Sequence, residues 1–243
     1  MRSMCNKYSF RRIDILLYRR LRYRKGHGVH SPFVYNLITK VIEERSPYYC
    51  FDDIELIRKQ IPDKKVATRQ AISPKHGALL FRLANHFNAE SILQVGSTAG
   101  LSMLYLSSHA PNRLCVSLET NPALVPIAKW VYEKADRTDI DQRTGDLSEM
   151  LRRALVEMKN PDIIYFNVCH EQSDPVALFN SCVRYLHTGS VIVFEGIRMN
   201  QRMRDSWKEI SSHSIVSVSI DLYSMGILFF NERLHKREYI VYF

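Results

Sequence analysis

The sequence lacks several features that would place it in a specialised class of protein. No apolar run approaches the roughly 20 consecutive residues that a membrane-spanning helix needs. The five cysteines are odd in number, widely spaced and never arranged as C-x-x-C, which argues against a disulfide framework or a zinc site. The run Ile13–Leu17 contains Asp14 and is followed by arginines, so it does not resemble a secretory signal. We therefore expect a cytoplasmic, reducing location.

Glycine is also scarce, with nine residues in 243, or about half of the usual ~7%. Five of the nine fall at predicted junctions between strands and helices: Gly96, Gly100, Gly145, Gly189 and Gly196. In so glycine-poor a chain, the closely spaced pair at 96 and 100 indicates a backbone constraint.

The rest of the composition is ordinary for a globular protein. With 46% apolar and 24% charged residues, it excludes a disordered chain, a collagen-like chain and a coiled-coil rod.

Positive charge is concentrated at the N-terminus. Residues 1–25 hold nine basic residues and one acidic residue, a net charge of +8, whereas the other 218 residues hold 25 basic and 24 acidic residues, a net charge of +1. The body of the protein is thus almost neutral, and a nucleic-acid footprint over the whole domain is not expected.

The basic segment has the pattern of an amphipathic helix, with Phe10, Ile13, Leu17 and Leu21 spaced three and four residues apart. Three interpretations remain open. The helix binds an anionic membrane surface, or it binds RNA or another polyanion. In the favoured interpretation it is a lid or a homodimer arm, whose apolar face packs on the core while its arginines remain solvated.

From residue 75 onward, apolar runs alternate with helical patterns of 9–13 residues, which indicates parallel βαβ units. The fold class we predict is α/β: a Rossmann-like, doubly wound, mostly parallel sheet with an antiparallel C-terminal hairpin. Residues 1–74 form a helical N-terminal extension or cap, and residues 75–243 form the α/β domain. The predicted strands are 91–95, 113–118, 140–144, 162–166, 190–194, 215–220 and 227–230, with 239–243 as a further candidate.

Small and polar residues follow the predicted strands at the edge where a doubly wound sheet binds ligands. The first strand ends in the turn Gly96–Gly100, which lets a backbone approach a ligand closely and exposes N–H groups at a helix start. Glu119 ends the second strand, where a carboxylate can accept two ribose hydroxyls. Gly145 and Asp146 end the third strand, and Asn167 ends the fourth.

Each of these positions also has a purely structural interpretation. The turn at Gly96–Gly100 can be a tight strand–helix connection without a ligand. Glu119 can be a solvated residue near a helix N-cap. Asp146 can be the N-cap of the helix that begins at Leu147, and this role is compatible with ligand binding.

The motifs LQVGSTAGLSMLYLS, LET, TGD, DIIYFN and GSVIVFEGI together resemble the class I S-adenosylmethionine-dependent methyltransferases, in the O-methyltransferase-like branch. The resemblance covers roughly residues 75–230, and the segment GHGVHSPF is similar to that of bacterial methyltransferase-like proteins of unassigned substrate. It implies methyl transfer from S-adenosylmethionine to oxygen or nitrogen of a small-molecule substrate. It also implies a methionine site at Gly96, Ser97, Thr98 and Gly100, a ribose site at Glu119 and an adenine site near Asp146.

The sequence departs from that family at positions that matter for chemistry. Gln94 stands where the family has an acidic residue, and Thr98 where many members have glycine. Metal-dependent members carry aspartate after the fourth strand and Asp-Asn after the fifth, whereas this chain has Asn167 and then Glu195-Gly196. A hard cation prefers several carboxylate ligands, so we predict no catalytic metal.

Without a metal, methyl transfer depends on positioning and on a base. His170, after the fourth strand, is the candidate general base, and Glu195 is a candidate for orienting the substrate or that base. An exposed loop histidine and an ordinary loop carboxylate are the alternatives. The rival function is a catalytically weak or inactive methyltransferase-fold protein that binds the cofactor or a partner. A nicotinamide oxidoreductase ranks below both, because the G-x-G-x-x-G turn is missing.

Overall fold

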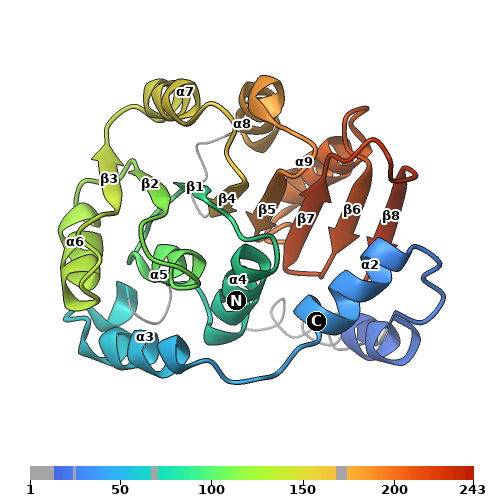
Figure 1. Ribbon diagram of the computed structural model, residues 1–243, viewed down its shortest axis with the longest axis horizontal. Coiled ribbons are helices and arrows are strands. Elements are labelled where there is room, and N and C mark those ends of the chain that lie inside the picture. The colour runs from blue at the N-terminus through green and yellow to red at the C-terminus, as the bar shows by residue number, and fades with distance from the viewer. Residues whose placement is uncertain (1–13, 24–25, 67–70, 168–173) are drawn as a thin grey trace, which may run out of the picture.

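Eight strands form one mixed β-sheet, shown in Figure 1 as a computed structural model that describes residues 14–23, 26–66, 71–167 and 174–243. The strands are β1 Ser91–Val95, β2 Leu114–Glu119, β3 Asp141–Thr144, β4 Ile163–Asn167, β5 Val191–Glu195, β6 Val218–Asp221, β7 Met225–Phe229 and β8 Arg237–Ile240. Their order is β3-β2-β1-β4-β5-β7-β6-β8. Strands β1 to β5 are parallel, β7 is antiparallel to β5 and β6, and β8 is parallel to β6.

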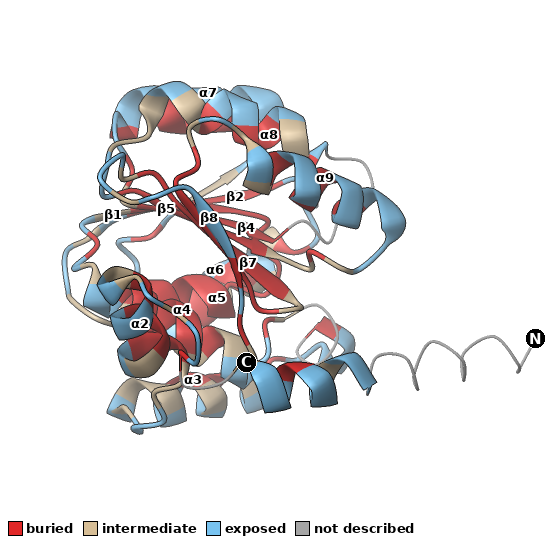
Figure 2. Ribbon diagram, turned by 90° about the vertical axis from the view of Figure 1, so that its right-hand side faces the viewer, coloured by how far each residue is buried: buried red, intermediate tan, exposed pale blue. Residues whose placement is uncertain are grey.

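Helices cover both faces of this sheet (Figure 2). In chain order they are α2 Pro32–Leu37, the π-helix η1 Ile38–Ile42, α3 Tyr49–Gln60, α4 Pro74–His86, α5 Leu101–Ser107, α6 Val125–Lys134, α7 Leu147–Met158, α8 Pro175–Cys182, the 3₁₀-helix η3 Val183–Tyr185 and α9 Gln201–Ser212. One apolar cluster joins α2 to α6 with one face of the sheet, and the other joins α7 to α9 with the opposite face. The sheet is therefore the middle of three layers.

Local sequence signals explain where the elements begin. Ser73, Asp146, Asp174 and Asn200 each cap a helix by accepting a backbone N–H with the side-chain oxygen. The central strands β4 and β5 are near-continuous apolar runs, buried on both faces apart from the partly exposed Glu195. The five strands β1 to β5 keep their predicted bounds within one residue, and α7 begins at Leu147 as predicted.

The predicted fold class is confirmed. The doubly wound sheet, its parallel half and its antiparallel C-terminal pair β6–β7 are all present. The last three strands differ from the sequence prediction. Strand β6 lies at 218–221 rather than 215–220, β7 at 225–229 rather than 227–230, and β8 at 237–240 rather than 239–243, paired with β6 at the sheet edge. Residues of α2, η1 and α3, such as Leu37 and Ile54, pack into the same apolar cluster as α4.

The N-terminal helix, described from residue 14 to residue 22, docks differently from the prediction. Leu17 is 54% exposed and Leu21 is 80% exposed, so the described part of the apolar face does not pack on the core. Arg19, which the prediction left solvated, is buried instead, and the Tyr242 N–H donates to the carbonyl of Tyr23. The favoured interpretation is therefore wrong in its packing: the physical reason is a buried anion that attracts the arginine.

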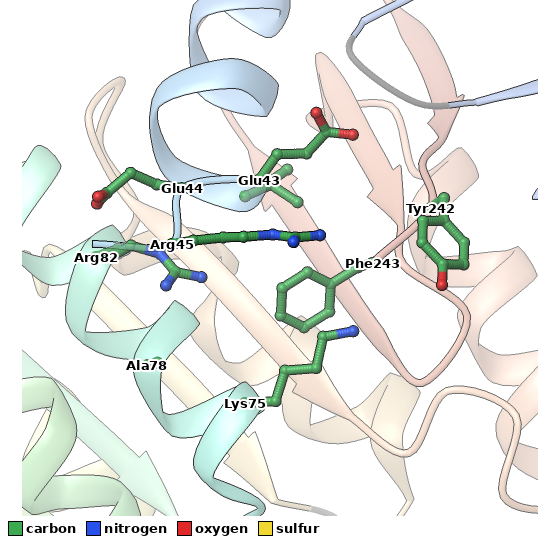
Figure 3. A pocket seen from close by; sticks show the side chains of 9 residues that line it. Glu43, Glu44, Arg45, Lys75, Ala78, Arg82, Tyr242 and Phe243 are labelled. Atoms are coloured by element: carbon green, nitrogen blue, oxygen red, sulfur yellow. The ribbon is translucent and has the colours of Figure 1, made fainter. Parts of the chain in front are cut away.

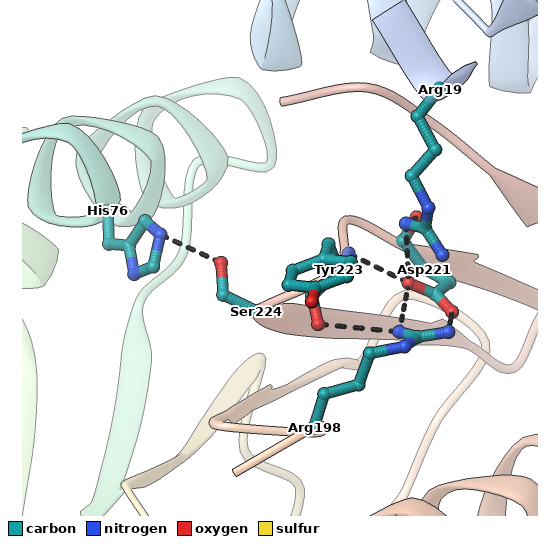
Figure 4. A network of polar contacts seen from close by, with 6 residues as sticks. All are labelled: Arg19, His76, Arg198, Asp221, Tyr223 and Ser224. Carbon is teal, nitrogen blue, oxygen red and sulfur yellow. Dashed lines mark hydrogen bonds and ion pairs between the residues drawn. The ribbon is translucent and has the colours of Figure 1, made fainter. Parts of the chain in front are cut away.

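That anion is Asp221, at the end of β6 (Figure 4). It accepts hydrogen bonds from Arg19 at 2.9 Å, from Arg198 at 2.7 and 2.5 Å, and from the Tyr223 N–H at 2.7 Å. Both guanidinium groups lie over the Tyr223 ring, 5.4 and 5.3 Å from its centroid. Burial alone would raise the pKa of Asp221, but the two arginines outweigh burial and hold that pKa below its ordinary value.

Among the described residues, none of the helices combines the length and the apolar character that crossing a bilayer requires.

We expect Asp221→Asn to lower the free energy of unfolding by about 3 kcal/mol or more, because it leaves the buried Arg19 without a counter-charge. Urea denaturation at pH 7 measures this. Asp205→Asn, at an exposed carboxylate that accepts from Gln201, is the matched control and should change stability by at most ~0.5 kcal/mol. Equal effects of the two substitutions would contradict the role of Asp221.

The same ion pairs predict how the free energy of unfolding depends on pH under acidic conditions. A carboxylate whose pKa is lowered by folding contributes stability that is fully present above its unfolded pKa, near 3.8, and is lost as pH falls through the folded value. The difference in unfolding free energy between the native chain and Asp221→Asn should therefore be constant from pH 7 to pH 5 and shrink below pH ~4. A difference that grows on acidification would contradict this.

Candidate active site

The first loop of the site is held against the neighbouring strand by a backbone contact. Gly96, directly after β1, has φ +85°, and a Cβ placed there would lie 2.4 Å from the carbonyl oxygen of Asn167 at the end of β4. The N–H groups of Gly96 and Ser97 donate to the carbonyl of Leu118 on β2. Only glycine fits this position, so the constraint that glycine scarcity indicated is confirmed.

The second glycine of the loop serves helix packing. Gly100 is the N-cap of α5 with φ +79°, and a Cβ there would lie 2.9 Å from the ring of Tyr132 and 3.2 Å from the Cα of Ala128, both on α6. Between the glycines, Thr98 has φ +49° and is buried. The whole turn is thus fixed by β2, β4 and α6 together.

Glu119, at the end of β2, binds the loop from the other side. Its side chain is fully buried and accepts from the Thr98 N–H at 2.7 Å and from the Asn121 N–H at 2.9 Å. The interpretation of Glu119 as a solvated residue is therefore wrong. Glu119 therefore holds the Gly96–Gly100 loop from the side of β2.

Two buried polar atoms beside this loop have no hydrogen-bond partner in the described part of the chain: Gln94 Oε1 and Ser97 Oγ. Gln94 lies on β1 and donates through Nε2 to the Gly96 carbonyl at 3.0 Å and to the Ser102 hydroxyl at 2.8 Å. An amide donor thus occupies the position where the resemblance implies an acid. Unsatisfied buried oxygens are costly, and they fit a loop that completes its hydrogen bonding with a bound polar ligand.

Gly145 and Asp146 lie farther out on the same edge of the sheet and are exposed. Asp146 caps α7 by accepting from the Glu149 N–H at 2.9 Å, as its structural interpretation predicts. The cap uses Oδ1 of a side chain that is exposed.

The structure adds a residue that sequence analysis missed. Asn167 and Glu195 are register partners on β4 and β5, and the Glu195 carboxylate lies 2.7 Å from Nδ1 of His76, in the first turn of α4. The other ring nitrogen, Nε2, lies 3.0 Å from the Ser224 hydroxyl in the β6–β7 turn (Figure 4). Glu195 and His76 are 119 residues apart. No local spacing reveals such a pair.

The predicted base and the cysteine thiols are the remaining candidate bases and nucleophiles. His170, the predicted base, lies outside the described residues. The thiols of Cys50, Cys115 and Cys182 are free. Burial raises the pKa of Cys115 to about 11 and that of Cys182 to about 12, so these thiols stay protonated at neutral pH and are poor nucleophiles.

A cavity of about 620 Å³ opens beside α4 (Figure 3). Its walls carry the cations Arg45, Lys75 and Arg82, and the Lys75 ammonium lies 4.1 Å from the centroid of the Phe243 ring. Burial and then the neighbouring charges of Arg45 and Arg82 lower the pKa of Lys75. The same Phe243 ring stacks on His76, with 5.9 Å between the ring centroids.

The positions that the sequence resemblance implies as metal ligands do not fit a divalent cation here. Asn167 offers an amide, Glu195 is paired with His76, and Gly196, at φ +72°, offers no side chain. The described residues contain no group of three His, Cys, Asp or Glu side chains arranged around a metal position. No step of the chemistry below depends on one.

Comparison with known proteins agrees with this geometry. A sequence model of the O-methyltransferase family matches residues 45–239, which is most of the chain. The chain belongs to the O-methyltransferase family. A curated relative, a catechol O-methyltransferase of Niastella koreensis, is 25% identical over 138 residues, which are 56% of this chain and 62% of the relative. The chain therefore aligns with less than two thirds of that protein.

Solved structures of family members share the fold. An O-methyltransferase from Bacillus cereus in complex with SAH aligns with a TM-score of 0.59 and 18% identity, over 81% of this chain and 97% of that one. TomG from Streptomyces achromogenes, an O-methyltransferase of tomaymycin synthesis in complex with SAM, aligns with a TM-score of 0.58 and 16% identity, over 82% and 95%. At this identity the likeness establishes the fold.

Gly96→Ala tests the contact between β1 and β4, and Gly28→Ala is its matched control. Both glycines have positive φ, +85° and +75°, but a Cβ at residue 28 meets nothing within 4 Å. We expect Gly28→Ala to cost about 1 kcal/mol of unfolding free energy, from the backbone conformation alone. Gly96→Ala should cost at least ~2 kcal/mol more, through the clash with Asn167. Urea denaturation measures both, and equal losses would contradict the contact.

Proposed function

We propose that the protein is a metal-independent methyltransferase that moves a methyl group from S-adenosylmethionine to oxygen or nitrogen of a small molecule. One observation carries the proposal: the buried Glu119 carboxylate and the Gly96–Gly100 loop meet at the carboxyl ends of adjacent parallel strands, next to unsatisfied polar atoms. When bound, the cofactor supplies a sulfonium-activated methyl group. The family membership and the relatives' activities support the same reaction class.

The roles of the individual residues are part of this proposal. Gly96, Ser97, Thr98 and Gly100 hold the methionine end, where backbone N–H groups suit a carboxylate. Glu119 binds the ribose hydroxyls, Gly145 and Asp146 border the adenine, and Asn167 borders the methyl-transfer end. The positions of these residues along one sheet edge support the assignment. Residues 1–74 would act as a cap on the domain 75–243, with their core contacts to α4 as support.

One observation favours the rival function. The Thr98 amide is already engaged by Glu119, and the loop is buried, which fits a protein of weak or no methyltransferase activity. The rival is a catalytically weak or inactive methyltransferase-fold protein that binds the cofactor or a partner. A turnover assay with S-adenosylmethionine separates the two functions, and calorimetry tests the cofactor binding.

We expect titration calorimetry to show binding of S-adenosylhomocysteine and S-adenosylmethionine, and Glu119→Gln to weaken binding at least tenfold. The reason is the loss of a charged acceptor for the ribose hydroxyls, an interaction typically worth about 1.5–3 kcal/mol. Glu133→Gln, at an exposed position on α6, is the control and should bind like the native chain. Absence of heat with both ligands would contradict the proposal, and binding of NADH instead would favour an oxidoreductase.

For the N-terminal helix we propose contact with an anionic membrane surface, in a cytoplasmic protein. Leu17, Tyr18 and Leu21 are neighbours on one side of the helix and are 54%, 54% and 80% exposed, while Arg20 and Arg22 are exposed beside them. Exposed apolar residues flanked by arginine suit a negatively charged lipid interface better than a rigid polyanion. The free cysteines support the reducing compartment.

Co-sedimentation with vesicles tests this contact. We expect binding to vesicles that contain phosphatidylserine and little binding to pure phosphatidylcholine, because charge and apolar insertion act together. The double variant Leu17→Glu/Leu21→Glu should lose binding, whereas Val156→Glu, at a 52% exposed position on α7, should retain it. Equal binding by both variants, or no binding by the native chain, would contradict the proposal.

A further inference from the structure

We propose that His76 is the general base of the methyl transfer and that Glu195 is its positioning residue. This rests on the proposed function and names the base of that same site. The combination of His76, Glu195 and Ser224 is not visible in the sequence, because these residues come from α4, β5 and the β6–β7 turn.

Three contacts fix the imidazole ring. Glu195 Oε1 lies 2.7 Å from Nδ1, Ser224 Oγ lies 3.0 Å from Nε2, and the Phe243 ring stacks on its face at 5.9 Å between centroids. The second oxygen of Glu195 accepts from the Tyr165 hydroxyl at 3.4 Å. The Glu195 carboxylate is therefore held by a second hydrogen bond. Together these contacts hold the His76 imidazole ring in one orientation.

These contacts also fix the tautomer. An ionised carboxylate only accepts hydrogen bonds, so Nδ1 of His76 must carry a proton and donate it to Glu195. In the neutral ring Nε2 then holds a lone pair, and the Ser224 hydroxyl donates to it. Nε2 is thus already placed as the acceptor of an O–H group, which is the contact a general base makes with its substrate.

The pair lies in reach of both cofactor and solvent. Glu195 is the register partner of Asn167, and the Asn167 carbonyl abuts Gly96 in the cofactor loop. Neighbouring strands are about 4.8 Å apart, so Glu195 stands two strands from β1 along the ligand-binding edge. The side chains of His76 and Glu195 are 17% and 18% exposed. An acceptor hydroxyl would take the place of the Ser224 hydroxyl at Nε2.

The step balances without a metal. His76 Nε2 takes the proton of the acceptor hydroxyl, and the acceptor oxygen forms a bond to the methyl carbon of the sulfonium donor. The bond from that carbon to sulfur breaks, its electron pair stays on sulfur, and the imidazolium is stabilised by the Glu195 carboxylate until the proton passes to solvent. A phenol, with a pKa near ~10, gives up its proton to imidazole far more readily than an aliphatic alcohol, so phenols are suitable probe acceptors.

The first test needs no acceptor. Nitrogen-15 NMR of histidine-labelled, full-length protein at pH 8 reports which ring nitrogen carries the proton. We expect His76 to show a protonated Nδ1 and an unprotonated Nε2, and Glu195→Ala to populate the opposite tautomer. A protonated Nε2 in the native chain would overturn the proposal, whether or not the cofactor binds.

The second test measures turnover with S-adenosylmethionine and two probe acceptors, phenol and catechol, in the presence of EDTA. We expect methylated product from the native chain, and His76→Gln to lower kcat at least hundredfold with unchanged affinity for S-adenosylhomocysteine. Glu195→Gln should lower kcat with little change in KM, as expected of a positioning residue. His86→Gln, an exposed histidine at the other end of α4, is the control and should stay within twofold.

The outcomes distinguish a failure of the proposed function from a failure of the assignment of His76 as the base. If the native chain binds neither S-adenosylmethionine nor its product, the proposed function fails. If it binds them but forms no product from either acceptor, loses activity in EDTA, or keeps more than a tenth of its kcat in His76→Gln, the assignment of the base fails while the cofactor site stands.

Discussion

The close approach of Gly96 to the carbonyl of Asn167 is the contact on which the site depends. It joins the end of β1 to the end of β4, and the parallel register then brings Asn167 beside Glu195 on β5. A side chain at residue 96 would separate these strand ends and move the loop away from Glu119. A single glycine in a glycine-poor chain thus aligns the cofactor side of the edge with the side that carries His76.

The C-terminal hairpin connects this edge to the N-terminal helix. Within four residues it carries Asp221, which binds Arg19 and Arg198, and Ser224, which bonds to His76. Tyr223 between them has φ +77° and lies under both guanidinium groups. Because one short turn takes part in both networks, the position of the basic helix and the position of His76 are structurally linked.

The fold could be predicted from the sequence because its signals are local: buried apolar strands, helix caps such as Asp146, and glycine at the strand ends. The positions of Glu119 and Asn167 followed from strand order alone. His76 could not be predicted, because its partner Glu195 is 119 residues away and a histidine in a first helical turn has no distinguishing pattern. Helical periodicity gave the wrong buried face for the N-terminal helix, because it predicts Leu17 and Leu21 as buried. It carries no information about Asp221, which lies 202 residues away and binds Arg19. Tertiary electrostatics decided that helix.

The central claim is that the cofactor loop and the His76–Glu195 pair form one site on one edge of the sheet. A crystal structure of the protein with S-adenosylhomocysteine and catechol tests it most directly. The account predicts the ribose hydroxyls on Glu119, the amino-acid end over Gly96–Gly100, and a catechol hydroxyl within hydrogen-bond distance of His76 Nε2 on the sulfur side. A ligand bound elsewhere, for example between Arg45 and Lys75, or a catechol oxygen separated from His76 by other side chains, would contradict it.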